Sequence, residues 1–222
     1  MGGKSTVSNF KALDLFCGAG GAAKGIADAG FSVTGVDIVP QPRFPFEFVQ
    51  RDALDTDLTG FDFVWASPPC QRHSRMTGCR EGLSAKYPDL IEATRAKLQA
   101  WGGLYIIENV VGAPLISPVL LCGAMFGRDT YCHRLFESNV ALSAPVHPRH
   151  VTPASKAGHW KPGTFISVAG NCSPMPLARQ VMGGIDWMTR SELVESIPPY
   201  FSKHLALQVL AQLTTPPENF WD

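Results

Sequence analysis

The chain has 222 residues, no net formal charge and a 45% content of hydrophobic residues, which is the balance of an ordinary globular protein. At this length the residues form one domain, or one domain with a small appendage, and bury enough surface to fold without disulfide or metal staples. No apolar run approaches the roughly 20 residues of a membrane span, and the first residues do not have the pattern of a signal peptide. We therefore expect a cytoplasmic protein with no membrane partner.

The six cysteines show neither a Cys-x-x-Cys pair nor the spacing of a small disulfide framework, so we expect free thiols. They are Cys17, Cys70, Cys79, Cys122, Cys132 and Cys172.

The first half of the chain alternates apolar runs with helix-forming segments. In chain order, strands are predicted at 12–16, 31–36, 46–50, 61–66 and 104–108, and helices at 21–29 and 88–100. Strands that alternate with helices form a parallel sheet with helices on both faces. We predict an α/β fold with a doubly wound, mostly parallel sheet.

The alternation stops between residues 143 and 176, where Pro, His, Gly and Ser dominate and one strand is predicted at 164–169. Helical periodicity returns at 191–195 and 203–213. We therefore divide the chain into a main domain, 1–137 with 181–222, and a small insert at 138–180.

Basic residues gather in two stretches. No acidic residue stands between Glu137 and Asp186, and the bases there include Arg149, Lys156 and Lys161. A second basic stretch follows Cys70 and contains Arg72, His73, Arg75 and Arg80. Each stretch is explained either by a solvated loop or by a negatively charged partner.

A glycine-rich turn, 14–21, follows the first predicted strand and begins a helix. Glycines at such a place let backbone N–H groups approach a ligand, although a tight turn also needs glycine for structural reasons. The dinucleotide pattern G-x-G-x-x-G is not met, because Ala23 stands where its last glycine would be.

Two carboxylates follow the next two predicted strands. Asp37 stands where an acid accepts hydrogen bonds from ribose hydroxyls, and Ile38 beside it offers a surface for an adenine face. Asp52 follows the third strand and could accept from the adenine amino group. With Asp14 of the glycine-rich turn, three carboxylates lie at three consecutive strand ends, which indicates a nucleoside ligand; a capping role is the alternative for any one of them.

Cys70 follows the fourth predicted strand in the sequence Ala66-Ser67-Pro68-Pro69-Cys70-Gln71. Basic residues after a cysteine lower its pKa, and the thiolate is the competent nucleophile; a buried structural cysteine is the alternative. The fifth strand ends in Glu108. The two side chains are expected to face one substrate from neighbouring strand ends.

Two hypotheses that place zinc at Cys70 have less support than the role of Cys70 as a nucleophile. A zinc deaminase needs Pro-Cys-x-x-Cys and an upstream His-x-Glu, but His73 stands at the last cysteine position and no histidine precedes it. A structural site built from Cys70, His73 and Cys79 lacks a fourth ligand. We expect no metal.

These residues together resemble the DNA cytosine C5-methyltransferase family, in its order and roughly its spacing. The resemblance covers the turn 14–21, Asp37, Asp52, Ser67 to Gln71, Glu108-Asn109-Val110 and Arg134-Leu135-Phe136. The segment from Met182 to Pro199 is similar to phage and prophage members in particular. The resemblance implies a Rossmann-like fold, double-stranded DNA as partner, and a bacterial or phage-infected cell; we expect a monomer.

The resemblance also implies a mechanism and its residues. Cys70 attacks C6 of a flipped cytosine, Glu108 hydrogen-bonds N3 and the exocyclic amine, Arg134 holds the base carbonyl, and C5 takes the methyl group of S-adenosylmethionine (SAM). The implied SAM-binding residues are Phe16, Cys17, Gly18, Ala19, Gly20, Gly21, Asp37, Ile38, Asp52, Ala53 and Pro68. The residues expected to bind DNA are Gln71, Arg72, Arg75, Arg149, Lys156 and Lys161.

Three features depart from the family pattern. Cys132 replaces an arginine, Val194-Glu195 replaces a Gly-Asn pair, and the insert 138–180 is short for a target-recognition domain. The alternatives are therefore an RNA or other cytosine-bearing substrate, a modified SAM donor, and a non-catalytic DNA-binding relative.

Overall fold

The computed structural model describes residues 10–69 and 90–215. Within them lies one seven-stranded sheet in the order β3-β2-β1-β4-β5-β7-β6. Its strands are β1 (Lys11–Leu15), β2 (Ser32–Asp37), β3 (Glu47–Gln50), β4 (Phe63–Ala66), β5 (Leu104–Asn109), β6 (Val119–Cys122) and β7 (His133–Ser138). The first five pair in parallel, whereas β7 runs antiparallel to both β5 and β6. The predicted doubly wound, mostly parallel sheet is confirmed.

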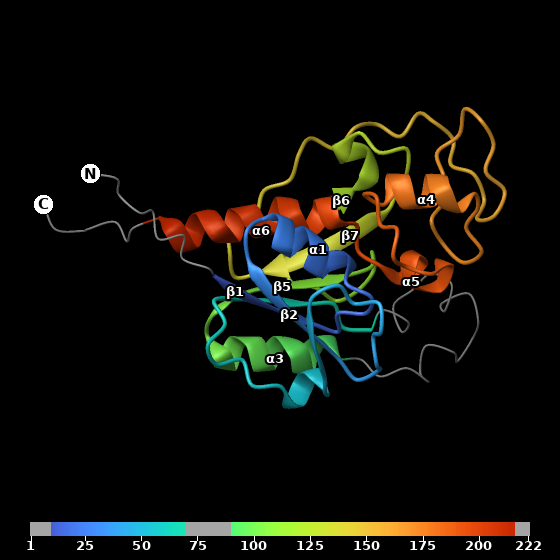
Figure 1. Cartoon of the computed structure of the whole chain (residues 1–222). Coiled ribbons are helices and arrows are strands. Elements are labelled where there is room, and N and C mark those ends of the chain that lie inside the picture. The colour runs from blue at the N-terminus through green and yellow to red at the C-terminus, as the bar shows by residue number, and fades with distance from the viewer. Residues whose placement is uncertain (1–9, 70–89, 216–222) are drawn as a thin grey trace, which may run out of the picture.

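Helices cover both faces of the sheet (Figure 1). Helices α1 and α6 lie on one face and α3 on the other, while α4 and α5 lie beyond one end of the strands. Their bounds are α1 (Gly21–Asp28), α3 (Ile91–Trp101), α4 (Met175–Val181), α5 (Arg190–Glu195) and α6 (Pro199–Thr214), with short 3-10 helices η1 (Ala53–Asp55) and η3 (Gly123–Phe126).

Strand β4 shows why the central strands are continuously apolar. Phe63 and Trp65 pack into the core beneath α1 and α6, and Val64 and Ala66 pack into the core beneath α3. All four side chains are fully buried. A strand between two helical layers has no polar face, which agrees with its unbroken apolar sequence.

The strand predicted at 164–169 is wrong. The described chain there makes an isolated bridge between Ala154 and Phe165, and Ile166 instead packs into a separate apolar cluster with helix α4. That cluster also contains Ala19 of the glycine-rich turn and Leu193 of α5. The later part of the predicted insert thus shares one apolar cluster with the turn that follows β1.

Among the described residues, no helix combines the length and the apolar character that crossing a bilayer requires. The four cysteines that are described, Cys17, Cys122, Cys132 and Cys172, are free thiols, as predicted.

Candidate functional site

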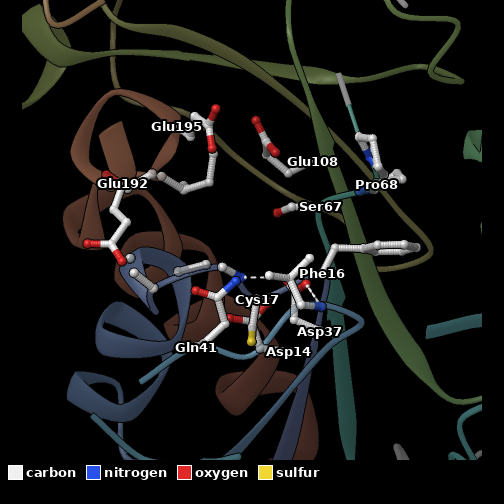
Figure 2. A pocket seen from close by; sticks show the side chains of 18 of the residues that line it. Asp14, Phe16, Cys17, Asp37, Gln41, Ser67, Pro68, Glu108, Glu192 and Glu195 are labelled. Atoms are coloured by element: carbon white, nitrogen blue, oxygen red, sulfur yellow. Dashed lines mark hydrogen bonds between the residues drawn. The ribbon is translucent and has the colours of Figure 1, made fainter. Parts of the chain in front are cut away.

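A cavity of about 460 Å³ opens at the carboxyl ends of β1, β2, β4 and β5. Figure 2 shows the side chains that surround it. Ten residues predicted from the sequence line this cavity together: Phe16, Cys17, Gly18, Ala19, Gly21, Asp37, Ile38, Pro68, Glu108 and Arg134. Most of the residues predicted to bind the cofactor and two of the residues predicted to be catalytic, Glu108 and Arg134, thus line the same cavity.

The glycine-rich turn forms one wall of the cavity. Gly18 and Gly20 have positive φ angles of 49° and 88°, and Gly20 is the N-cap of α1. A Cβ atom on Gly21 would lie 2.5 Å from the Ile197 carbonyl oxygen. Glycine is therefore required here for backbone conformation and for close packing, and the same turn presents the start of α1 to the cavity.

Asp37 fastens two segments of the cavity wall. Its carboxylate accepts hydrogen bonds from the Gly18 amide at 3.0 Å and from the Val39 amide at 2.9 Å. Ile38 beside it is exposed and faces the cavity. An acid next to an exposed aliphatic side chain suits a ligand with hydroxyl groups and a flat apolar ring.

Asp52 and Ala53 lie apart from these residues. Asp52 accepts a hydrogen bond from the Leu54 amide at 2.8 Å and caps η1, while Ala53 is buried in the core beneath α3. Neither lines the cavity as the described residues form it. The capping alternative is thus visible for Asp52, and its role toward a nucleoside stays a prediction.

Asp14, the carboxylate of the first strand end, has a feature that the sequence did not predict. Its carboxyl group is fully buried, and neither oxygen accepts a well-aligned hydrogen bond within the described structure, although the Ala23 amide faces it. Burial raises its pKa well above the usual value, and the charges of Asp37 and Glu108 raise it further. A buried polar group without a partner is a candidate for a ligand contact.

Glu108 lies at the end of β5 with 5% of its surface exposed. Burial raises its pKa to about 7, against the opposing effects of Arg134 and of a hydrogen bond with Ser67. Arg134 Nε lies 3.1 Å from Glu108 Oε1. Burial thus favours the protonated form of this carboxyl group near neutral pH, in which one oxygen donates a hydrogen bond and the other accepts one.

Asn109 connects this strand end to the loop that leads to Cys70. Its side-chain amide donates a hydrogen bond to the Pro68 carbonyl oxygen at 3.0 Å. The Trp65 indole donates to the Ser67 hydroxyl at 2.9 Å. Both contacts fix the chain just before residue 70. The predicted residues Cys70, Gln71, Arg72 and Arg75 lie outside the described residues. The zinc site considered at Cys70, His73 and Cys79 lies outside them as well.

Cys17 is the thiol that lines the cavity among the described residues, but it is not suited to be a nucleophile. Burial, with added repulsion from Asp14 and Asp37, raises its pKa far above the normal range of a thiol. Burial also raises the pKa of Cys132, which stands where the resemblance implies an arginine. Neutral thiols of this kind are unreactive.

The opposite wall comes from α5 and its flanks, which the sequence prediction left out of the site. Glu192, Glu195, Ser196 and Ile197 line the cavity there. Arg43 holds Glu192 through contacts of 2.7 to 3.0 Å, and its hydrogen bonding lowers the pKa of Glu192 to about 2. In the sequence, Val194-Glu195 replaces a Gly-Asn pair of the family pattern. This departure was the one sign that Glu195 could belong to the site.

The predicted DNA-binding residues of the insert lie elsewhere. Arg149, Lys156 and Lys161 are exposed, and none of them lines the cavity. Their role in binding DNA stays a prediction.

No family model matches the chain. It is 32% identical over 142 residues to the type II methyltransferase M.AgeI of Thalassovita gelatinovora; the match covers 53% of this chain and 32% of that protein. The chain thus spans about a third of that relative's length.

Solved structures extend the likeness to nearly the whole chain. A protein described as a DNA modification methyltransferase from an Escherichia coli prophage aligns with a TM-score of 0.65 and 14% identity, over 93% of this chain and 100% of that one. The Dnmt2 methyltransferase of S. pombe aligns with a TM-score of 0.59 and 13% identity, over the same shares.

The chain has the Rossmann-like methyltransferase fold. At this level the resemblance to DNA methyltransferases drawn from its sequence is confirmed. The methyltransferase fold also explains the place of the cavity, because ligands of open α/β sheets bind outside the carboxyl ends of the strands.

Proposed function

We propose that the protein transfers a methyl group from SAM to C5 of cytosine in double-stranded DNA. The observation that carries the proposal is the buried Glu108, paired with Arg134, in the same cavity as the glycine-rich turn and Asp37. A nucleoside-type ligand site and a group suited to a heterocyclic base thus share one cavity. The likeness to a type II methyltransferase supports the same reading.

The residues of the cavity fit SAM. Asp37 and Ile38 would hold the ribose and the adenine face, and the turn 16–21 would surround the methionine part. Among the described residues of the lining, five carry a carboxyl group and Arg134 is basic. Burial favours the neutral form of Asp14 and Glu108, and Arg43 pairs with Glu192. Asp37 and Glu195 remain to face the sulfonium and ammonium groups of SAM.

Bound SAM supplies an electrophilic methyl group. Glu108 acts on the other reactant: in its protonated form it donates a hydrogen bond to N3 of cytosine, and its second oxygen accepts one from the exocyclic amine. Negative charge pushed into the ring is thereby stabilised where it develops. Burial of Glu108 favours the protonated form near neutral pH, and Arg134 would hold the base carbonyl.

Cys70 is the proposed nucleophile. Its thiolate forms a bond to C6, which breaks the C5–C6 double bond and makes C5 nucleophilic toward the methyl group. Loss of the C5 proton then restores the double bond and expels the Cys70 thiolate. The contacts of the described residues Ser67, Pro68 and Asn109 support this assignment, since they hold the chain that follows β4, as far as it is described, against the end of β5 that carries Glu108.

Nucleoside mass spectrometry tests the proposal. The chain would be expressed with plasmid DNA in a host that lacks its own cytosine methylation, and both DNA and RNA would be digested. We expect 5-methylcytosine in the DNA with the wild-type chain and none with Cys70→Ser, because the serine hydroxyl has too high a pKa to act without a base.

The same measurement distinguishes the alternatives. Modified cytosine in RNA but not in DNA would indicate an RNA substrate, and an added group larger than methyl would indicate a different donor. Methylation of adenine, or of the cytosine amino group, would contradict C5 chemistry. Calorimetry should show that Cys70→Ser still binds SAM, which separates loss of chemistry from loss of folding.

A further inference from the structure

One cysteine and three histidines converge where strands β6 and β7 meet the chain that follows β7. The ligand atoms of Cys122, His133, His147 and His150 all lie within 4.8 Å of one another. Cys122 Sγ lies 3.4 Å from His150 Nε2, and His147 Nε2 lies 3.4 Å from His133 Nε2. The four side chains therefore point their potential ligand atoms at a common centre.

The fold places these residues from three separate stretches of chain. Cys122 ends β6 and lies opposite His133, the first residue of the antiparallel β7, so that both side chains project to the same side of the sheet. His147 and His150 come from the irregular segment after β7 and are separated by Pro148 and Arg149. Tyr131 stacks on the His150 ring with a centroid distance of 3.6 Å and restricts its orientation.

We propose that Cys122, His133, His147 and His150 form a tetrahedral zinc site. Zinc ligands at about 2.0 to 2.3 Å from the ion lie about 3.3 to 3.8 Å from one another in a tetrahedron, which agrees with the two 3.4 Å separations, Cys122 to His150 and His147 to His133. One thiolate and three imidazoles suit Zn²⁺, whereas Mg²⁺ and Ca²⁺ prefer oxygen ligands. Four protein ligands leave no open position, so the site is structural and not catalytic.

This inference departs from the sequence expectation of no metal. The sequence shows no compact motif, because the cysteine and the first histidine become neighbours through strand pairing. Two separate hydrogen bonds, Cys122 with His150 and His147 with His133, would account for each contact by itself. They do not require the two pairs to meet at one centre, whereas a shared ion does.

The proposed zinc holds the start of the insert against the sheet. Residues 141–150 form no helix or strand, and Val146 and Val151 are strongly exposed, so this stretch has little apolar burial to fix it. Cys122 at the base of the cluster is fully buried, while His147 and His150 are exposed. The ion would thus connect a surface segment to the edge of the core and would position Arg149 between two of its ligands.

Metal content and cobalt spectroscopy of the full chain test the site. We expect about one zinc per purified chain, removable by a strong chelator and restored by Zn²⁺. With Co²⁺ in place of zinc, the visible bands of a tetrahedral ion and a thiolate-to-cobalt charge-transfer band should appear. The charge-transfer band should disappear in Cys122→Ser and persist in the matched control Cys172→Ser, whose cysteine is equally buried.

The histidines supply the second arm. His147 is exposed, so His147→Ala should leave the fold intact while weakening Zn²⁺ binding at least tenfold; His147→Cys, which restores a ligand, should recover tight binding, and His159→Ala outside the cluster should change nothing. Chelation should also expose the chain near residues 141–150 to a protease. A cobalt spectrum without a thiolate band, or wild-type and His147→Ala chains that bind Zn²⁺ equally, would overturn the proposal.

Discussion

At the scale of single residues, the cavity depends on acids that the fold has removed from water. Glu108 and Asp14 are both buried, and burial is the first cause of the raised pKa of each. Arg134 compensates Glu108 in part. Asp14 lacks a well-aligned hydrogen bond among the described residues, so its burial costs stability that a bound ligand could restore.

We predict that stability depends on pH through Glu108. Its pKa is raised from 4.5 to about 7 on folding, so the folded chain keeps a proton that the unfolded chain releases. Its contribution to the free energy of unfolding is fully present below pH 4.5 and is lost as the pH rises through about 7. Glu108→Gln stays neutral throughout, so its stability relative to the wild type should improve between pH 5 and pH 8.

Urea unfolding of both chains at several pH values measures this difference. Asp14 also titrates, but it is present in both chains, so the comparison isolates most of the Glu108 effect. A difference in unfolding free energy that stays constant from pH 5 to pH 8 would show that Glu108 does not keep its proton on folding.

At the scale of elements, the packing of α1 against α6 determines how the glycine-rich turn is held. Gly25 lies in the middle of α1, where glycine is normally unfavourable by about 1 kcal/mol relative to alanine. A Cβ atom there would lie 2.0 Å from the Pro199 carbonyl oxygen and 2.1 Å from Ser202 Oγ. The glycine thus permits a close helix contact at the cost of helix propensity.

Gly25→Ala should therefore destabilise the protein by about 1 to 3 kcal/mol, the usual cost of overpacking, even though alanine is the better helix former. Thermal or chemical unfolding measures the change. The exposed Ala100 of α3 offers a reference, because Ala100→Gly should report the propensity term without a clash. Stabilisation by Gly25→Ala would mean that α6 moves away readily.

The sequence predicts the parallel half of the sheet better than the antiparallel half. Strands such as β4 are buried on both faces and show as apolar runs between turn residues. Strand β7 instead begins with the polar residues His133 and Arg134, which are only half-buried, so its sequence does not begin as an apolar run. Its pairing with β6 is therefore visible in the structure and not in the sequence pattern.

The same distinction applies to the site. Residues at the carboxyl ends of parallel strands, such as Asp37 and Glu108, are predictable because these strands end at one edge of the sheet. Glu195 is less predictable, because it reaches the cavity from a helix distant in sequence. Asp52 illustrates the opposite case, a strand-end acid that caps a 3-10 helix.

At the scale of the whole molecule, the zero net charge hides a separation of charge. Acidic side chains gather around the cavity, whereas residues 138–185 contain no acid and carry the exposed Arg149, Lys156 and Lys161. A segment of this kind suits the phosphate backbone of DNA, while the acidic cavity suits a cationic cofactor. The positive charge of the segment would attract the DNA duplex to a surface outside the cavity, which leaves the cavity free for the cofactor.

The acid-free segment 138–185 is the surface that we expect to contact the phosphate backbone of a DNA substrate. We expect Arg149, Lys156 and Lys161 to contact phosphates and to position the duplex rather than read bases. Replacing one of them by alanine should reduce the magnitude of the salt slope, log K against log salt concentration, by about one unit per lost contact and weaken all DNA sequences alike. Fluorescence anisotropy with two unrelated duplexes at several salt concentrations measures both effects.

Lys11 provides the control for that experiment. It is exposed at the amino end of β1, at the opposite edge of the sheet from the cavity, so Lys11→Ala should leave the slope unchanged. The zinc proposal adds an expectation for Arg149, because His147 and His150 flank it. Removal of zinc by a chelator should reduce the contribution of Arg149 to DNA affinity more than that of Lys161. If a substitution instead changed which cytosines are methylated while the overall affinity stayed the same, that residue would be a reader of bases, and the segment would recognise sequence directly.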